Sequence, residues 1–254
     1  MSGHSIRVFP DECRDFDFLR PSVEATFATI DNFVEKQTCP TDIQLPYWSN
    51  ERATLSQLAA GICRSNANNL VVEEYQCTKG TLNEPWKGRR DLWFRIEDQI
   101  CHAEAKQSGI CWPCVGQFTP RDAECCVRLA IEEARASQRD SVWTTSQRTY
   151  ATHISSGDVL EEKRKPRCFG IVFIVPYVTL KGRPECDSQI RQFGSAMNAA
   201  LESTTKAGDH RIMWARYFRA GLLKESLFFD SPYYKTWISM PELDILICES
   251  GSGG

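Results

Sequence analysis

The feature that most constrains the fold of this chain is a nearly uninterrupted apolar run, FGIVFIVPYV, at Phe169–Val178. A strand with apolar side chains on both of its faces must be covered on both, because an open face would leave apolar surface in water. The run contains a proline and is too short to span a membrane. We therefore expect a buried strand within a sheet.

Sequence patterns predict the other elements. Apolar residues at helical spacing predict helices at Pro21–Lys36, Ser49–Ser65, Pro120–Gln138 and Cys186–Thr204. Residues that favour strands predict strands at Leu70–Cys77, Arg89–Ile96, Ile100–Gln107, His210–Phe218 and Glu242–Glu249. The core order is therefore helix, three-strand meander, helix and buried strand, which is an α/β fold with a mixed sheet.

The length of 254 residues and the 42% hydrophobic content suit one globular domain. We expect this domain at residues 1–250, with a core at about 49–180, a helical N-terminal addition and further α/β elements at 181–249, followed by a flexible tail at 250–254. The chain shows no secretory start, so its 12 cysteines are expected to be reduced thiols of a cytoplasmic protein. No membrane association is expected.

The predicted hairpin GRRDLWFRIEDQICHAEAKQ, Gly88–Gln107, places charge where strands usually pack. Glu104 and Lys106 are two residues apart and share a face, and an antiparallel neighbour across a short turn can bring Asp91 beside Glu104. Two adjacent carboxylates repel each other unless a cation lies between them, and Mg²⁺ prefers oxygen ligands. A lysine on the same face can stabilise charge on a phosphate.

The spacing Asp91–x12–Glu104–Ala105–Lys106 on neighbouring strands resembles the PD-(D/E)XK nuclease superfamily. The core order at residues 49–180 is similar to the restriction-endonuclease-like fold of that superfamily. The resemblance implies an endo- or exonuclease that hydrolyses phosphodiester bonds with Mg²⁺ or Mn²⁺. It implies that Asp91 and Glu104 bind the metal and that Asp91, Glu104 and Lys106 are catalytic. In one departure from the pattern, Arg90 stands where the superfamily has proline.

Many members of the superfamily carry a further upstream glutamate at the metal site. The candidates here are Glu51, Glu73 and Glu74, and Glu74 is favoured because its strand lies beside Asp91. Gln107 and His102 are candidate auxiliary residues, since one follows Lys106 and the other shares the face of Glu104.

Lys87, Arg89 and Arg90 lie at the mouth of the hairpin and could bind a polyanion. The Cys-x-x-Cys pair Cys111–Cys114 lacks a second suitably spaced pair, so we do not expect zinc. The net charge of −3 gives no overall basic character.

We expect nucleic acid as the partner, DNA rather than RNA, in a restriction or antiviral defence role that rests on analogy. The alternative is a non-catalytic module of the same fold that binds nucleic acid or a protein partner. A surface hairpin with incidental salt bridges is a further alternative. The sequence leaves open whether a protein activator is needed and whether the chain forms a homo-oligomer.

Overall fold

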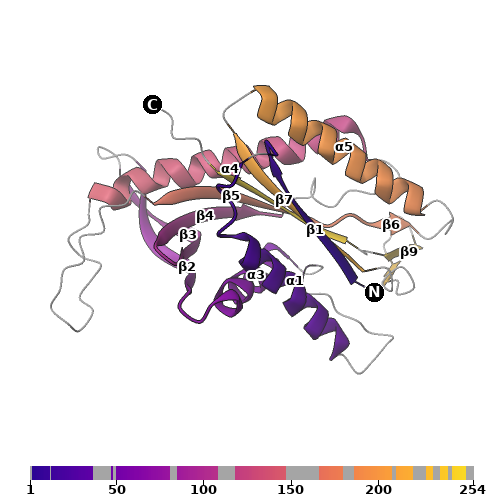
Figure 1. Cartoon of the computed structure of the whole chain (residues 1–254), viewed down its shortest axis with the longest axis horizontal. Coiled ribbons are helices and arrows are strands. Elements are labelled where there is room, and N and C mark those ends of the chain that lie inside the picture. Colours follow the sequence, from indigo (N-terminus) through magenta and orange to yellow (C-terminus); the bar gives the residue numbers. More distant parts are fainter. Residues whose placement is uncertain are drawn as a thin grey trace.

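The structure is a computed structural model that describes residues 2–11, 13–36, 47, 50–80, 85–107, 118–146, 166–179, 186–207, 210–219, 227–230, 235–239 and 242–249. This part of the chain forms an α/β fold with four helices and a seven-stranded mixed sheet (Figure 1). A smaller sheet contains β6 (Val178–Thr179), β9 (Lys235–Ser239) and β8 (Leu227–Asp230) in that order. None of the described helices is long and apolar enough to cross a membrane.

The seven strands of the large sheet come from both ends of the chain. In spatial order they are β1 (Ser2–Phe9), β7 (Arg211–Arg219), β10 (Glu242–Glu249), β5 (Arg167–Ile174), β4 (Gln99–Lys106), β3 (Pro85–Ile96) and β2 (Leu70–Gly80). Neighbours are antiparallel except β4 and β5, which run parallel. A parallel pair needs a crossover connection, and α4 (Pro120–Ser146) lies between these two strands in the chain.

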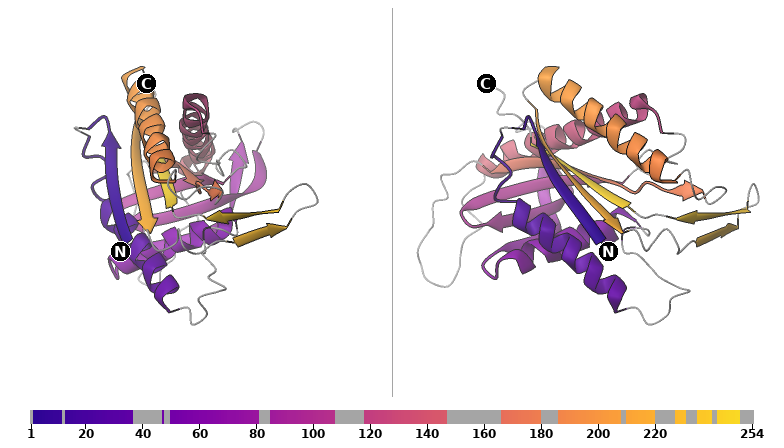
Figure 2. Two further views of the ribbon diagram at one scale, coloured as in Figure 1. Left: turned by 90° about the vertical axis from the view of Figure 1, so that its right-hand side faces the viewer. Right: turned by 45° about the vertical axis from the view of Figure 1, so that its right-hand side comes forward.

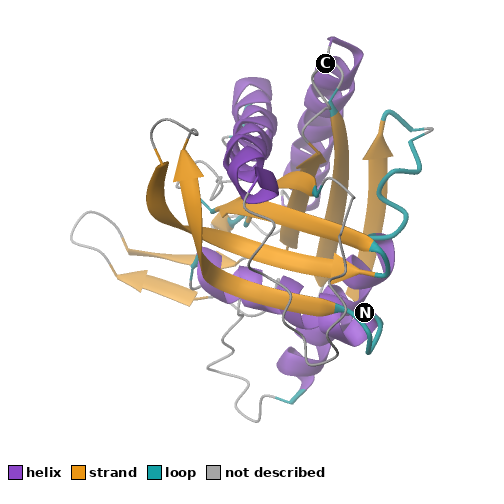
Figure 3. Cartoon of the chain, turned by 90° about the vertical axis from the view of Figure 1, so that its left-hand side faces the viewer, coloured by secondary structure: helices purple, strands orange, loops and turns teal. Residues whose placement is uncertain are grey.

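Helices cover both faces of the large sheet (Figures 1 and 2). The helices α1 (Arg20–Glu35) and α3 (Glu51–Ser65) share one buried cluster with Phe169, Ile171 and Phe173 of β5. The helices α4 and α5 (Cys186–Ala207) share the other with Val172 and Ile174. The prediction that this strand is covered on both faces is confirmed, and Figure 3 shows the sheet between the two helical layers.

Two glycines allow unusually close packing in these layers. A Cβ atom at Gly61 of α3 would collide with the backbone of α1 at Ser22 and Thr26. A Cβ atom at Gly170 of β5 would collide with backbone atoms of Ala130 and Ala134 in α4, and would lie 2.8 Å from the carbonyl carbon of Glu133. The backbone of α4 therefore lies directly on β5, beside the strand that carries Glu104.

The structure differs from the predicted layout or adds to it at several places. Residues Ser2–Phe9 form the edge strand β1, although we expected only a helical addition before the core. The sequence left open where the predicted strands β7 and β10 lie relative to the core, and they extend the core sheet, because β10 pairs with β5 and β7 pairs with β10. Helix α4 continues to Ser146, beyond the predicted end at Gln138. The first two differences depend on pairing between segments far apart in the chain, which local patterns do not reveal.

Candidate active site

The β3–β4 hairpin brings Asp91 to the backbone between Glu104 and Lys106. The regular pairing of the two strands runs from Ile96 opposite Gln99 to Leu92 opposite Ala103. Beyond that point a side chain joins the two strands: the Oδ2 atom of Asp91 accepts a hydrogen bond of 2.8 Å from the backbone N–H of Ala105. The carboxylate of Asp91 is thus fixed beside the Glu-Ala-Lys segment.

Glu104 and Lys106 lie on the face of the sheet that α4 covers. Their register partners in β5 are Gly170 and Val172, and Val172 belongs to the buried cluster on the α4 side. Glu104 is 6% exposed, whereas Lys106 at the end of β4 is exposed. The strand therefore holds its carboxylate in the interior and its ammonium at the surface.

Glu51 reaches the same end of β4 from the other helical layer. It is the first residue of α3, and Asn50 caps this helix by accepting a 2.9 Å hydrogen bond from the N–H of Ala53. The Glu51 Oε2 atom accepts a 2.7 Å hydrogen bond from the N–H of Gln107, which follows Lys106. The side chain of Gln107 bonds to Thr54 and to the carbonyl of Tyr47, so this candidate auxiliary residue anchors the end of β4 to the α3 layer.

Glu133 of α4 is a site residue that the sequence analysis missed. Burial raises the pKa of its half-buried carboxyl; the Lys106 ammonium lowers it, and the negative charges of Asp91 and Glu51 raise it. Lys106, Asp91 and Glu51 therefore all lie close enough to Glu133 for their charges to act on its carboxyl group. The sequence held one signal for this residue: Glu133 directly precedes Ala134, which belongs to the apolar face of the helix, so Glu133 lies at the edge of that face.

The favoured third ligand, Glu74, is directed elsewhere. Its backbone has a φ of 48°, and its carboxylate forms ion pairs of 2.5 Å with Arg52 of α3 and 3.2 Å with Arg89. Its neighbour Glu73 accepts a 2.7 Å hydrogen bond from Ser56 of α3. Of the three upstream glutamates, Glu51 is the one whose charge acts on Glu133 together with that of Asp91.

The basic residues at the mouth of the hairpin are mostly engaged. Arg90 is 0% exposed and contacts the Nδ1 atom of His102, which removes it from any surface that could meet nucleic acid. Arg89 is exposed but paired with Glu74. The side chain of Lys87 and the Cys111–Cys114 motif lie outside the described residues.

His102 is 5% exposed and belongs to a buried polar cluster. Its Nδ1 atom lies 3.2 Å from the hydroxyl of Tyr75, and its carbonyl accepts a 3.2 Å hydrogen bond from Ser137 of α4. These contacts join β2, β4 and α4. The candidate auxiliary residue His102 therefore has a structural position in the interior, next to the strand segment that carries Glu104.

The donor atoms at the site are carboxylate oxygens, which suit Mg²⁺ or Mn²⁺ and not a soft metal. Among the described residues, no group of three or more His, Cys, Asp and Glu side chains is arranged so that it could hold a metal ion. In both Asp91 and Glu51, one carboxylate oxygen accepts a hydrogen bond from a backbone N–H, and the other oxygen could bind a cation. The negative charges of Asp91 and Glu51 near Glu133 are the feature that a divalent cation would offset.

A hard cation between such carboxylates, with an ammonium group beside a phosphate, would supply the chemistry of metal-assisted phosphodiester hydrolysis. Comparison with known proteins found no match for this chain among family models, curated proteins or solved structures.

Proposed function

We propose that the chain is a metal-dependent nuclease of the PD-(D/E)XK type, with Asp91, Glu104 and Lys106 as its catalytic residues and DNA as its substrate. The observation that carries this proposal is the hydrogen bond from the Ala105 N–H to the Asp91 carboxylate. It joins an acid on one strand to the residue between the acid and the lysine of the next strand. A surface hairpin with solvated charges has no need of such a contact.

The order of elements around the hairpin also supports the proposal. The segment contains α3, the antiparallel strands β2, β3 and β4, the helix α4 and the strand β5, which is parallel to β4. This order of elements agrees with the one that the resemblance to the restriction-endonuclease-like fold implies. The remaining strands β10, β7 and β1 extend the sheet beyond β5.

Each residue of the site has its own role in the proposed reaction. Asp91, Glu104 and Glu51 would hold a divalent cation, which supplies charge neutralisation at the phosphate and lowers the pKa of a bound water. Lys106 is exposed at the end of β4 and stabilises negative charge on the phosphate in the transition state. Glu133 of α4 lies close enough to Lys106 for their charges to interact. In this proposal Glu51 replaces Glu74 as the third acidic residue.

The test is cleavage of plasmid, linear duplex, single-stranded DNA and RNA in the presence of Mg²⁺, Mn²⁺ or EDTA. We expect the wild-type protein to cut DNA with either metal and not with EDTA. Lys106→Ala should lower the rate by about 100-fold or more, because it removes a group that acts on developing charge. The matched control is Lys36→Ala, which removes an exposed lysine at the end of α1 on the opposite face of the sheet.

Cutting that persists unchanged in Lys106→Ala or in EDTA would contradict the proposal. So would a folded wild-type protein that neither cuts any substrate nor binds Mg²⁺ in calorimetry. Cleavage of RNA alone would support the nuclease activity but would make RNA, and not DNA, the substrate.

A second candidate function is a non-catalytic module with the same fold that binds nucleic acid or a protein partner. The observation that favours it is that no group of three metal-ligating side chains is preformed among the described residues. This alternative would be supported if the protein binds a labelled DNA duplex in EDTA and does not cleave the duplex with any metal.

A further inference from the structure

Two exposed arginines share one glutamate beside the proposed nuclease site. The carboxylate of Glu74 in β2 pairs with Arg52 of α3, with 2.5 Å between Oε1 and Nη2, and with Arg89 of β3, with 3.2 Å between Oε2 and Nη1. Both arginine side chains are 69% exposed. The closest contact of each guanidinium uses one nitrogen atom, whereas arginine has five N–H donors. The Arg52–Glu74–Arg89 cluster therefore has donors left at the surface and one positive charge in excess.

The backbone of Glu74 has an unusual conformation that directs its carboxylate to this cluster. The pairing of β2 with β3 is regular on both sides of Glu74 but skips the row that Glu74 shares with Asp91. Glu74 has a φ of 48°, in the left-handed region that a residue with a side chain rarely adopts. Such strain persists only where the surrounding structure maintains it, and it is concentrated at functional sites.

Arg52 occupies a position that is unfavourable for a cation. It lies in the first turn of α3, where the helix dipole is positive. Its exposed ion pair with Glu74 is of a kind that adds little to stability. The stability of the helix therefore does not account for an arginine at this position, which points to a contact with an anion outside the protein.

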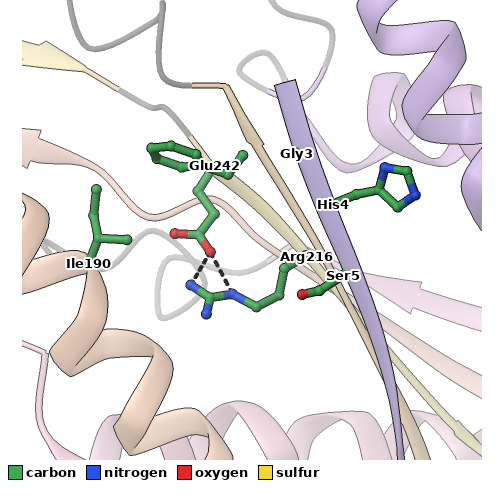
Figure 4. Close-up of a pocket in the computed structure, with 7 residues that line it drawn as sticks. Gly3, His4, Ser5, Ile190, Arg216 and Glu242 are labelled. Carbon is green, nitrogen blue, oxygen red and sulfur yellow. Dashed lines mark hydrogen bonds and ion pairs between the residues drawn. The ribbon is translucent and has the colours of Figure 1, made fainter. Parts of the chain in front are cut away.

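Arg216, on the other side of the sheet, shows the opposite arrangement. It lies in the wall of a cavity of about 330 Å³, where it contacts Glu242 (Figure 4) and also Asp244. Its side chain is 24% exposed, and both acids are buried. The charge of Arg216 is thus compensated inside the fold. Arg52 and Arg89 share a single carboxylate at the surface, so their charge remains available to a partner.

The cluster is a direct neighbour of two acids of the proposed nuclease site. Arg52 follows Glu51, whose carboxylate accepts the N–H of Gln107 at the end of β4. Glu74 lies opposite Asp91 on the adjacent strand, and the backbones of paired strands are about 4.8 Å apart. A polyanion that places one phosphate at the proposed metal site therefore passes close to the cluster.

We propose that Arg52 and Arg89 together bind a backbone phosphate of the DNA substrate, next to the phosphate that is cleaved. The inference rests on the proposed function, since the nuclease site defines the position of the cleaved phosphate. Guanidinium groups bind phosphate oxygens through paired N–H donors. Glu74 holds the two guanidinium groups beside each other. A phosphate contact positions the strand without reading its bases, so the cluster acts on any DNA sequence.

The experiment measures binding of a short, fluorescently labelled DNA duplex to the full-length protein by anisotropy in EDTA, so that metal-dependent cleavage does not interfere. The binding constant is determined over a range of KCl concentrations. Each phosphate contact contributes about −0.9 to the slope of log K against log[KCl]. Inorganic phosphate and pyrophosphate form a second arm, which separates a small phosphate ligand from a nucleic-acid backbone.

Matched variants test the two arginines. Arg52→Ala and Arg89→Ala should each weaken binding and make the slope shallower by about 0.9. Arg52→Lys keeps the charge and should keep the wild-type slope. Arg128→Ala is the control, because Arg128 of α4 is also 69% exposed and pairs with a glutamate, Glu132; it should bind as the wild type does. Circular dichroism checks that each variant is folded.

Shallower slopes in both alanine variants, with wild-type slopes in Arg52→Lys and Arg128→Ala, would support the phosphate contact. Unchanged slopes in Arg52→Ala and Arg89→Ala, an equal loss in Arg128→Ala, or no duplex binding by the wild type would overturn it. Binding of phosphate or pyrophosphate without binding of the duplex would also overturn it, because the cluster would then be a site for a small anion.

Cleavage by the same proteins with Mg²⁺ separates this inference from the proposed function. Metal-dependent cutting by the wild type, together with unchanged slopes in both alanine variants, would leave the nuclease in place and overturn the phosphate contact. Duplex binding that depends on both arginines, without cutting in any metal, would support the phosphate contact and contradict the nuclease.

Discussion

Asp91 combines a structural and a chemical contribution in one side chain. Its Oδ2 atom accepts the N–H of Ala105 at the point where regular β3–β4 pairing ends. Its charge acts on Glu133, together with those of Glu51 and Lys106. Two substitutions separate these contributions, because asparagine keeps an acceptor oxygen and loses the charge, whereas alanine loses both.

We expect Asp91→Asn to fold with nearly wild-type stability but to lose about 100-fold or more of any metal-dependent cleavage. Asp91→Ala should lose the same activity and also about 1–3 kcal/mol of stability, because it leaves the buried Ala105 N–H without an acceptor. Urea unfolding and the cleavage assay measure the two effects. Equal stability losses in both variants would show that the hydrogen bond is not what holds this end of the hairpin.

At the scale of elements, the contact between α4 and β5 positions the site. Gly170 is the register partner of Glu104, and the α4 backbone at Ala130, Glu133 and Ala134 lies against it. This contact sets how close Glu133 comes to Lys106. The helix can approach this far only because position 170 has no side chain.

We therefore expect Gly170→Ala to destabilise the protein by about 1–3 kcal/mol, because its new methyl group meets backbone atoms that cannot rotate away. Any cleavage activity should fall as well, since α4 must move away from the sheet. Gly3→Ala is the matched control, since its Cβ atom meets nothing within 4 Å, and it should change stability by no more than about 0.5 kcal/mol. Similar unfolding midpoints for the two variants would contradict this account of the α4–β5 contact.

At the scale of the whole molecule, one face of the large sheet carries two separate groups of charge. Glu104 and Lys106 lie on β4 beneath α4, and Arg216, Glu242 and Asp244 lie on β7 and β10 on the α5 side. Apolar residues of β5 and β10, including Val172 and Leu246, lie between them. The first group is the one that we propose acts on a phosphate, and the second affects the stability of the whole fold.

We expect the free energy of unfolding to fall as pH rises from about 5 to about 8. Glu242 and Asp244 keep their protons in the folded state above the ordinary pKa values of 4.5 and 3.8, so the folded state binds more protons than the unfolded state. Their stabilising contribution is complete below those values and is lost as pH rises through the raised pKa values. The slope for one such proton is at most about 1.4 kcal/mol per pH unit.

Urea unfolding at several pH values measures this dependence. Glu242→Gln removes the titratable group at this position. Its free energy of unfolding should therefore fall less steeply with pH than that of the wild type. Glu35→Gln, with its exposed acid, should follow the wild-type curve. Identical slopes for wild type and Glu242→Gln would contradict the assignment of raised pKa values to this pair.

The sequence by itself determined the elements whose patterns are local. The apolar positions Val23, Phe27, Ile30 and Val34 predicted α1, and all four are buried. The alternation on either side of the turn at residues 97–98 predicted the β3–β4 hairpin, and two-residue periodicity put Glu104 and Lys106 on one face. The continuous apolar run predicted the buried strand β5, which has helices on both sides.

Only the tertiary structure decided which distant groups meet. The positive φ at Glu74 and its ion pair with Arg52 direct that acid to α3, while the capped start of α3 brings Glu51 to the end of β4. The approach of α4 adds Glu133, and pairing with β7 makes residues 2–9 a strand. Secondary structure follows from short-range side-chain periodicity, whereas these contacts depend on register, crossover and helix docking between distant segments, which no local pattern encodes.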